Sequence, residues 1–356
     1  MLGEIYYYDN IIIIIKEEVK NLCNRRSEFM KNIKIIGNTP MIKINYEFNN
    51  RAKYIYAKLE YYNLTGSIKD RVAFYIINNA KKRVDLKENM PIIEATSGNT
   101  GISLAALGKK YKHKVYIFMP DWVSNERIEL MKGYGAEVIL YSKEEGGFIR
   151  CIEEAKKLAI TKKGFLANQF ANNDNFLAHY ETTGKEIIDQ LPEEIYGFVS
   201  GVGTGGTLMG TGKRLKEKFK NLQIVAIEPD KMPLITNLKY HKTIQTNGTH
   251  KIEGIGDEFV PDLIDKNEID DVILVNDDDS INMAKKLAKE LGLGVGISSG
   301  ANLIGSILLN EKIDKPVVTV FADDNKKYLS TDLFKEFRQK DEWISGKIKL
   351  IDYNVI

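Results

Sequence analysis

The sequence predicts an α/β protein of two domains, each built on a mostly parallel sheet that is covered by helices. Its 356 residues are too many for one small core and suit two domains. Short apolar segments alternate with helix-like segments, which is typical of a parallel sheet with helices on both faces. This alternation occurs in each half of the chain. We therefore expect a site between the domains, at the carboxyl ends of the strands.

The first half of the chain supplies the first set of elements. Residues 53–62 alternate apolar and polar side chains, as a strand does. Residues 69–83 place Val72, Ile76 and Ala80 on one helical face, which predicts a helix packed by that face. By the same patterns we expect strands at 91–96, 114–120 and 136–142, and helices at 99–111, 124–134 and 147–163.

The second half repeats the alternation. Apolar segments predict strands at 198–204, 223–229, 271–277 and 316–323, with helices at 205–220, 279–291 and 300–311. From these elements we expect an extension over 1–29, an N-terminal domain over 30–165, a C-terminal domain over 166–330 and a tail over 331–356.

The N-terminal extension contains an unusual run of five isoleucines at 11–15. A membrane span needs about 20 apolar residues, and the acidic Glu4 and Asp9 do not suit a signal peptide. The alternatives for this segment are an added strand or helix, or a translated leader before a start at Met30. We expect a segment outside the catalytic fold, and no membrane partner.

Composition restricts the class of protein further. The net charge of +2 gives no reason to expect a nucleic acid partner. Two cysteines, Cys23 and Cys151, form no disulfide framework and fit a cytoplasmic location. The four histidines are scattered without metal-ligand spacing, so no metal site is predicted.

A candidate reactive lysine, Lys69, lies where an apolar segment ends and a helical one begins. Burial lowers the pKa of a lysine, and a neutral amine is what attacks a carbonyl to form a Schiff base. The alternative is an exposed Lys69 paired with a nearby acid, which is the usual state of a lysine.

Two further loops follow predicted strands and open predicted helices. The loop 203–207, GTGGT, offers backbone N–H groups to an anion such as a phosphate, although it is neither a dinucleotide fingerprint nor a Walker loop. The loop 96–100, TSGNT, offers hydroxyls and a helix N-terminus to a carboxylate. The alternatives are a tight strand–helix turn for the first loop, and a helix cap by Ser97 or Asn99 for the second.

With these loops, the sequence resembles the pyridoxal-phosphate (PLP) enzymes of the cysteine synthase and cystathionine β-synthase group, which have fold type II, like the tryptophan synthase β subunit. The matching segments occur in the family's order between about residues 30 and 330. They are TGSIKDR at 65–71, EATSGNTGISLA at 94–105, MP at 119–120, GAEVIL at 135–140, NQFANNDN at 168–175, GVGTGGTLMGTGK at 201–213, EGIG at 253–256 and GISSGA at 296–301.

The resemblance implies a role for each segment. Lys69 would hold pyridoxal 5′-phosphate, Asn99 would bond its ring hydroxyl, and Ser298 would face its pyridine nitrogen. Helix capping is the alternative for Ser298 and is our expectation for Ser299. The phosphate would be bound by Gly203, Thr204, Gly205, Gly206 and Thr207, and the substrate carboxylate by Thr96, Ser97, Gly98, Thr100 and Gln169.

The resemblance also implies a reaction: β-replacement on a three-carbon amino acid such as L-cysteine, O-acetyl-L-serine or L-serine, through an α-aminoacrylate. Lys69 would take the α-proton as general base and later return it. A small-molecule amino acid is therefore the expected substrate, and a homodimer the expected assembly. The serine opposite the pyridine nitrogen would favour loss of the β-substituent over transamination.

The sequence departs from cysteine synthases at Asp257 and Glu258, where those enzymes carry small uncharged residues. Two carboxylates would disfavour an anionic bisulfide. We hypothesise that one of them activates water or a thiol, so that L-cysteine would release hydrogen sulfide. Exposed carboxylates paired with lysines are the alternative, and Asp230 is a third candidate base.

Other functions stay open. An ordinary O-acetylserine sulfhydrylase would use sulfide as the nucleophile, and a serine or threonine dehydratase would carry out elimination alone. A non-catalytic binding protein of the same family would be expected to lose Lys69, which is present here.

Overall fold

The computed structural model describes residues 35–245, 249–336, 340 and 342–356. The chain divides into two units, Met1–Asn38 and Thr39–Ile356. The sheets, helices and cavities belong to the second unit. The predicted extension over 1–29 and the isoleucine run lie outside the described residues.

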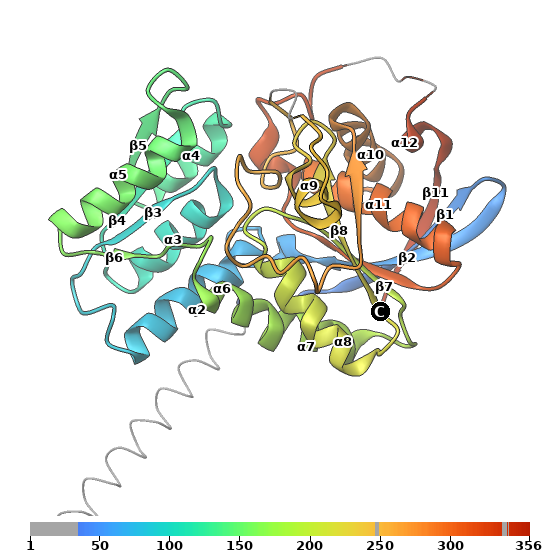
Figure 1. The fold of residues 1–356 in the computed structure, drawn as a ribbon, viewed down its shortest axis with the longest axis horizontal. Helices are drawn as coiled ribbons and strands as arrows, with labels where there is room; N and C mark the ends of the chain where they lie inside the picture. Colours follow the sequence, from blue (N-terminus) through green and yellow to red (C-terminus); the bar gives the residue numbers. More distant parts are fainter. Residues whose placement is uncertain (1–34, 246–248, 337–339, 341) are drawn as a thin grey trace, which may run out of the picture. The chain divides into compact units, whose positions relative to one another are not determined.

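The larger of two sheets has seven strands, in the order β11-β1-β2-β10-β7-β8-β9 (Figure 1). From β2 to β9 all neighbouring strands are parallel, whereas β1 is antiparallel to both of its neighbours. Its strands are β1 (Met41–Phe48), β2 (Arg51–Leu59), β7 (Gly197–Gly201), β8 (Gln223–Pro229), β9 (Asp271–Val275), β10 (Val317–Phe321) and β11 (Lys349–Val355).

The smaller sheet has four parallel strands in the order β5-β4-β3-β6. These are β3 (Ile92–Ala95), β4 (Val115–Pro120), β5 (Glu137–Tyr141) and β6 (Phe165–Leu166). The α/β class predicted from the sequence, with two mostly parallel sheets covered by helices, is confirmed.

Helices fill most of the remaining chain. They are α2 (Lys69–Lys82), α3 (Asn99–Lys110), α4 (Asn125–Gly133), α5 (Gly147–Thr161), α6 (Asn173–Ala178), α7 (Gly184–Gln190), α8 (Gly212–Lys218), α9 (Leu234–Tyr240), α10 (Asp277–Leu291), α11 (Ile297–Ile313) and α12 (Ile344–Lys347). Short 3₁₀ turns are η1 (Glu60–Tyr62) and η4 (Asn325–Tyr328), and π-helical turns are η2 (His179–Thr183) and η3 (Thr207–Thr211). In the described part of the chain, no helix is both long and apolar enough to cross a lipid bilayer.

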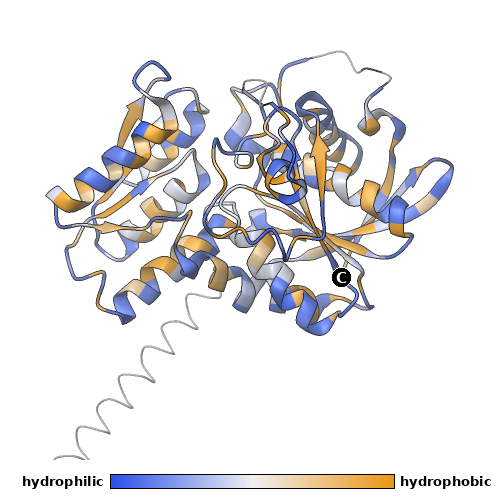
Figure 2. Cartoon of the chain, in the orientation of Figure 1, coloured by the Kyte–Doolittle hydropathy of each residue, from blue (hydrophilic) through white to orange (hydrophobic). Residues whose placement is uncertain are grey.

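Helices cover both faces of the larger sheet because strand side chains alternate between the faces. Along β8, Val225 packs in the core shared with α10 and α11, whereas Ile224 and Ala226 pack in the core shared with α7 and α8. Figure 2 shows the result: apolar strands inside, and helices with one apolar and one polar side. In the smaller sheet, α5 contributes Phe148 and Cys151 to the core beneath β3 and β4.

Most predicted elements are confirmed to within a few residues, and β8 coincides with the predicted 223–229. The predicted helix at 205–220 is confirmed within two residues, although its first turns form the π-helical turn η3 before α8 begins. The sequence does not predict β1, whose two partners include β11 from the predicted tail. Both β1 and β2 belong to the larger sheet, although they precede the strands of the smaller sheet in the chain.

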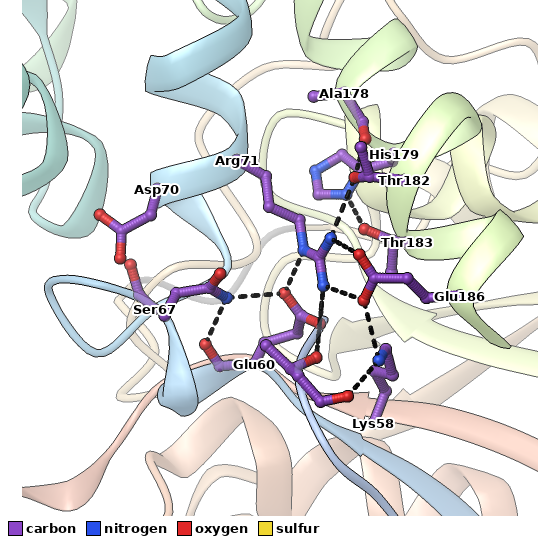
Figure 3. A network of polar contacts seen from close by, with 12 residues as sticks. Lys58, Glu60, Ser67, Asp70, Arg71, Ala178, His179, Thr182, Thr183 and Glu186 are labelled. Carbon is purple, nitrogen blue, oxygen red and sulfur yellow. Dashed lines mark hydrogen bonds and ion pairs between the residues drawn. The ribbon is translucent and has the colours of Figure 1, made fainter. Parts of the chain in front are cut away.

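A buried ion cluster fixes the start of α2 (Figure 3). The Arg71 guanidinium donates from Nε and Nη2 to Glu60 at 2.6 and 2.8 Å, and from Nη1 and Nη2 to Glu186 at 2.6 and 2.7 Å. Lys58 pairs with the same Glu186 at 2.9 Å. Two cations and two carboxylates thus balance each other between β2, η1, α2 and α7, and they hold the helix on which Lys69 lies.

Candidate active site

One cavity brings together most of the residues that the sequence predicts for the site. It opens where β3, β7 and β10 end, as expected at the carboxyl ends of parallel strands. Thirteen predicted residues line it: Lys69, Thr96, Ser97, Gly98, Asn99, Thr100, Gln169, Gly203, Thr204, Gly205, Thr207, Asp257 and Ser298. We call this the inner cavity. Gly206 and Glu258 are absent from its lining, and so is Asp230, whose carboxylate accepts a hydrogen bond from Asn276.

Lys69 is the first residue of α2 and faces the inner cavity. Burial lowers the pKa of its amine to about 8, while the charges of Asp257 and Asp323 act in the opposite direction. Within the described part of the chain, no hydrogen bond or ion pair reaches its Nζ atom. The preceding Ile68 donates its backbone N–H to Ala322 at 2.8 Å. Lys69 is therefore held by its backbone, and its amine is available for chemistry.

The loop before α3 forms one wall of the inner cavity. Thr96 Oγ1 accepts the Gly98 N–H at 3.1 Å, and Thr100 Oγ1 donates to Gln169 Oε1 at 2.5 Å. The alternative of a helix cap by Ser97 or Asn99 is wrong, because Gly98 precedes the first helical residue and no side chain caps it. A Cβ on Gly98 would lie 2.5 Å from Arg127 Cδ, so this loop needs glycine where it packs on α4.

The glycine-rich loop after β7 is closely surrounded by backbone and side chains. A Cβ on Gly203 would lie 2.4 Å from the carbonyl oxygen of Gly254, and Gly205 has a φ of +86°. Both positions therefore require glycine. A Cβ on Gly206 would lie 2.0 Å from Asn175 Oδ1, which explains how Gly206 shapes the loop without lining the cavity. Backbone N–H groups can approach an anion closely in such a loop.

Two side chains behind this loop orient its hydroxyls. Asn175 Nδ2 donates to Thr204 Oγ1 at 2.8 Å and to the Gln169 carbonyl at 2.9 Å. Thr207 Oγ1 lies 3.2 Å from His179 Nε2, and burial lowers the pKa of His179 well below its usual value. Neutral His179 and Asn175 therefore fix the threonines that face the cavity.

A third group of residues includes Asn99 and Ser298, which the sequence predicts to face a pyridine ring, and Asp323. Ser298 is 5% exposed and lines the cavity. Asn99 donates from Nδ2 to Asp323 at 2.7 Å, while its buried Oδ1 has no hydrogen-bond partner among the described residues. The expectation that Ser299 caps α11 is wrong, since its hydroxyl accepts the N–H of Ala322 at 3.2 Å.

The two acidic residues of interest differ in environment. Asp257 lines the inner cavity, and burial raises the pKa of its carboxyl to about 6, while the Lys69 charge lowers that pKa and the Glu258 charge raises it. Glu258 is exposed and lines a neighbouring cavity of about 590 Å³, which we call the outer cavity. Asp257 lines both cavities.

An ion pair lies at the boundary between the cavities. Arg127 of α4 pairs with Glu253, and both residues line both cavities. The Arg127 guanidinium also stacks on the Tyr328 ring, 4.7 Å from its centroid. The outer cavity is also lined by Trp122, Phe148 and Lys143.

Sequence reasoning missed several residues of this site, namely Glu94, Arg127, Asn175, His179 and Asp323. Asp323 is the second residue after β10, close to the carboxyl end of the strand, where the sheet topology predicts site residues. Glu94 lies in β3 and accepts the backbone N–H of Gln169 at 3.1 Å; burial raises its pKa to about 8. Among the described residues, no group of His, Cys, Asp and Glu is placed to hold a metal ion.

An enclosed lysine, a carboxylate-binding loop and a glycine-rich anion loop around one cavity define a pyridoxal-phosphate enzyme of the α/β class. The residues fit this cofactor. Lys69 Nζ and Asn99 Oδ1 have no partner among the described residues and so are available to it. In the glycine loop, added Cβ atoms would collide with neighbouring atoms, so the backbone is left open to a phosphate. Residues 33–323 match the family model of the pyridoxal-phosphate dependent enzymes. The chain belongs to this family.

Comparison with known relatives shows which group of this family the chain belongs to. The chain is 39% identical over 303 residues to cysteine synthase of Staphylococcus aureus, covering 84% of this chain and 95% of that protein. It is 41% identical over 302 residues to cysteine synthase B of Campylobacter jejuni, covering 84% and 97%. The protein is therefore a PLP-dependent enzyme of the cysteine synthase-like group, as the sequence predicts.

Among solved structures, similar proteins include enzymes with a second activity. A hydrogen sulfide-producing enzyme from Fusobacterium nucleatum superimposes with a TM-score of 0.87 at 46% identity, covering 94% of this chain and 99% of that one. An aspartate-to-asparagine mutant of that enzyme was solved in complex with an α-aminoacrylate intermediate. A second hydrogen sulfide-producing enzyme of the same organism gives a TM-score of 0.76 at 39% identity, covering 83% and 98%.

Proposed function

We propose that this enzyme replaces the β-thiol of L-cysteine, releasing hydrogen sulfide, with Asp257 as the base that activates the incoming water or thiol. The observation that carries the proposal is a carboxylate, Asp257, in the same cavity as Lys69. With water, L-cysteine and H₂O give L-serine and H₂S. With a thiol in place of water, L-cysteine and the thiol give a thioether amino acid and H₂S.

Lys69 is proposed to hold the cofactor and to move the α-proton. When bound, PLP withdraws electrons from the α-carbon of the amino acid, so that the α-proton can leave and the β-substituent can be expelled. Because burial lowers the pKa of Lys69 to about 8, its amine loses a proton near neutral pH more readily than an exposed lysine. A base with a pKa close to the working pH is the most effective in proton transfer.

The loop 96–100 is proposed to bind the α-carboxylate of the substrate. It combines hydroxyl groups with the free N–H groups at the start of α3, a helix of 12 residues whose dipole favours an anion there. Thr100 and Gln169 are bonded to each other at 2.5 Å, so they close one side of this loop. The substrate would thereby be oriented with its α-carbon toward Lys69.

The glycine loop is proposed to bind the phosphate and Ser298 to face the pyridine nitrogen. Thr204 and Thr207 are oriented by Asn175 and His179, as described above. A serine hydroxyl beside the nitrogen carries no charge. It leaves that nitrogen largely neutral, which favours loss of the β-substituent over transamination.

The choice of nucleophile follows from charge. A carboxylate in an enclosed site repels an anionic nucleophile and attracts the proton of a neutral one. With a pKa of about 6, Asp257 is ionised above that pH and can accept this proton. The names of the two hydrogen sulfide-producing relatives support release of sulfide rather than its use. Glu258, exposed in the outer cavity, is the less suitable base.

The test compares donors and two matched variants. We expect the purified holoenzyme to release sulfide from L-cysteine, and to do so faster than it forms cysteine from O-acetyl-L-serine and sulfide. Asp257→Asn should slow sulfide release about 10²–10⁴-fold, while Glu258→Gln, which removes the same charge one residue away, should change it less than about threefold.

The ordinary O-acetylserine sulfhydrylase is the second candidate, because the curated cysteine synthases are 39% and 41% identical to this chain. If O-acetyl-L-serine and sulfide react well, L-cysteine releases no sulfide and Asp257→Asn is as active as the wild type, this second function is correct. Assembly as a homodimer and a cytoplasmic location remain predictions from the sequence.

A further inference from the structure

Three segments that face the inner cavity meet at Asp323, just after β10. Two of them bond to its backbone region. Ser67, from the segment before Lys69, forms an isolated β-bridge with Asp323. Gly296, from the segment before Ser298, donates its N–H to the Asp323 carbonyl at 3.0 Å. The lysine and the serine proposed to face the cofactor are therefore fixed to one turn.

The side chain of Asp323 reaches the third segment. Its Oδ2 accepts from Asn99 Nδ2 at 2.7 Å and from the Tyr328 hydroxyl at 2.8 Å. A carboxylate can only accept here, so the nitrogen of the Asn99 amide must point toward Asp323. This leaves Oδ1 and the second Nδ2 hydrogen of Asn99 for a ligand. Oδ1 has no partner in the described part of the chain.

Stability of the fold does not explain this arrangement, because it includes an unsatisfied buried oxygen. Asp323 is 1% exposed, and its Oδ1 has no hydrogen-bond partner among the described residues. A Cβ on Gly296 would lie 2.0 Å from that oxygen, so the carboxylate fits only because residue 296 is glycine. A buried carboxylate oxygen without a donor is costly, so its presence needs an explanation, such as a role in the site.

We propose that Asp323 is a positioning residue, which holds the Asn99 amide in the orientation that meets the ring hydroxyl of the bound cofactor. The proposal rests on the cofactor site proposed above and assigns to it a residue that would act on the ring through Asn99. The Asp323 charge has a second effect. It favours positive charge at Lys69, and therefore at the nitrogen that links Lys69 to the cofactor.

The test removes the carboxylate and follows the cofactor rather than turnover. The holoenzyme is stripped of PLP and the cofactor is titrated back. For Asp323→Ala we expect the PLP dissociation constant to rise about tenfold, as for loss of a charge-assisted hydrogen bond. The pH at which the absorbance of bound PLP changes should move to lower values, because a nearby negative charge is gone. Asp323→Asn, which keeps an acceptor without the charge, should have an intermediate PLP affinity.

Two variants control for a merely structural loss. Tyr328→Phe removes the other donor to the same oxygen but leaves the Asn99 bond. Asp324→Asn removes a neighbouring carboxylate that does not line the inner cavity. Both should retain PLP affinity within about twofold and the absorbance midpoint within about 0.3 pH units, because neither side chain lines the inner cavity.

A double variant decides whether Asp323 acts through Asn99. In an Asn99→Ala background, Asp323→Ala should weaken PLP binding no further, because the amide to be oriented is gone. Additive losses, or a wild-type affinity and midpoint in Asp323→Ala, would overturn the inference. A wild-type protein that binds no PLP would instead overturn the proposed cofactor site, so the two failures are distinguishable.

Discussion

Lys58 of β2 and Lys69 of α2 are both largely enclosed by protein, but they meet opposite surroundings. Lys58 uses all of its donor capacity: it bonds the Thr39 carbonyl at 2.5 Å and Gln190 at 2.8 Å, and pairs with Glu186 at 2.9 Å. Lys69 has no such partner among the described residues and faces a cavity. Burial lowers the pKa of both amines. The difference teaches that burial alone does not make a lysine reactive. The amine must also be free of hydrogen bonds and ion pairs to other side chains.

The largest expected effect is on catalysis at Lys69. Lys69→Met keeps a similar volume but removes the amine, so we expect sulfide release from L-cysteine to fall by at least about 10³-fold. The free energy of unfolding of the cofactor-free protein should not decrease, because an unpaired buried charge is lost. Sulfide assays and urea unfolding measure the two. A variant that retains more than a tenth of the activity would remove Lys69 from the proposed mechanism.

Lys58→Met should show the opposite pattern. It leaves Glu186 with one cationic partner fewer inside a buried cluster, and breaking such a cluster costs about 3 kcal/mol of unfolding free energy. Per folded molecule, turnover and PLP content should stay within about twofold of the wild type. If Lys58→Met lost activity but not stability, the contrast between the two lysines would be wrong.

The fold was largely predictable because its parallel strands are short apolar runs and its helices have one apolar face. The exceptions have physical causes. Strand β1, MIKINYEF, mixes apolar and polar residues, and its two antiparallel neighbours, β2 and β11, lie near opposite ends of the chain. The helical pattern at 205–220 does not distinguish the π-helical turn η3 from α-helix, because π-helix is rare and occurs mostly as single turns within α-helices.

The site was predictable where loops carry it and unpredictable where single side chains do. The segments around Lys69, Asn99 and Ser298 and the glycine loop are recognisable by residue type and spacing. Asp323 and His179 give no such signal, because their partners are far away in sequence: Asn99 for Asp323 and Thr207 for His179. The sequence left Asp257 and Glu258 equivalent, whereas their exposure distinguishes them.

The smallest effect is expected in the pH dependence of the free energy of unfolding, which tests the contrast between Lys58 and Lys69. The folded-state pKa of Lys69 is about 8, below its usual 10.5. A lowered pKa contributes stability that is present above the unfolded pKa and is lost as the pH falls through the folded one. The cofactor-free wild type should therefore gain up to about 3 kcal/mol relative to Lys69→Met between pH 7 and pH 10.5, since one pKa unit corresponds to about 1.4 kcal/mol.

Because Lys58 is present in both proteins, its own titration cancels in this difference. Urea unfolding at several pH values measures this difference in the free energy of unfolding. The control repeats the comparison without Lys58, between Lys58→Met and the Lys58→Met/Lys69→Met double variant. It should give the same dependence on pH. A flat difference would mean that Lys69 is solvated or paired in the folded protein. The free amine on which both its proposed attachment to PLP and its proton transfer depend would then be absent.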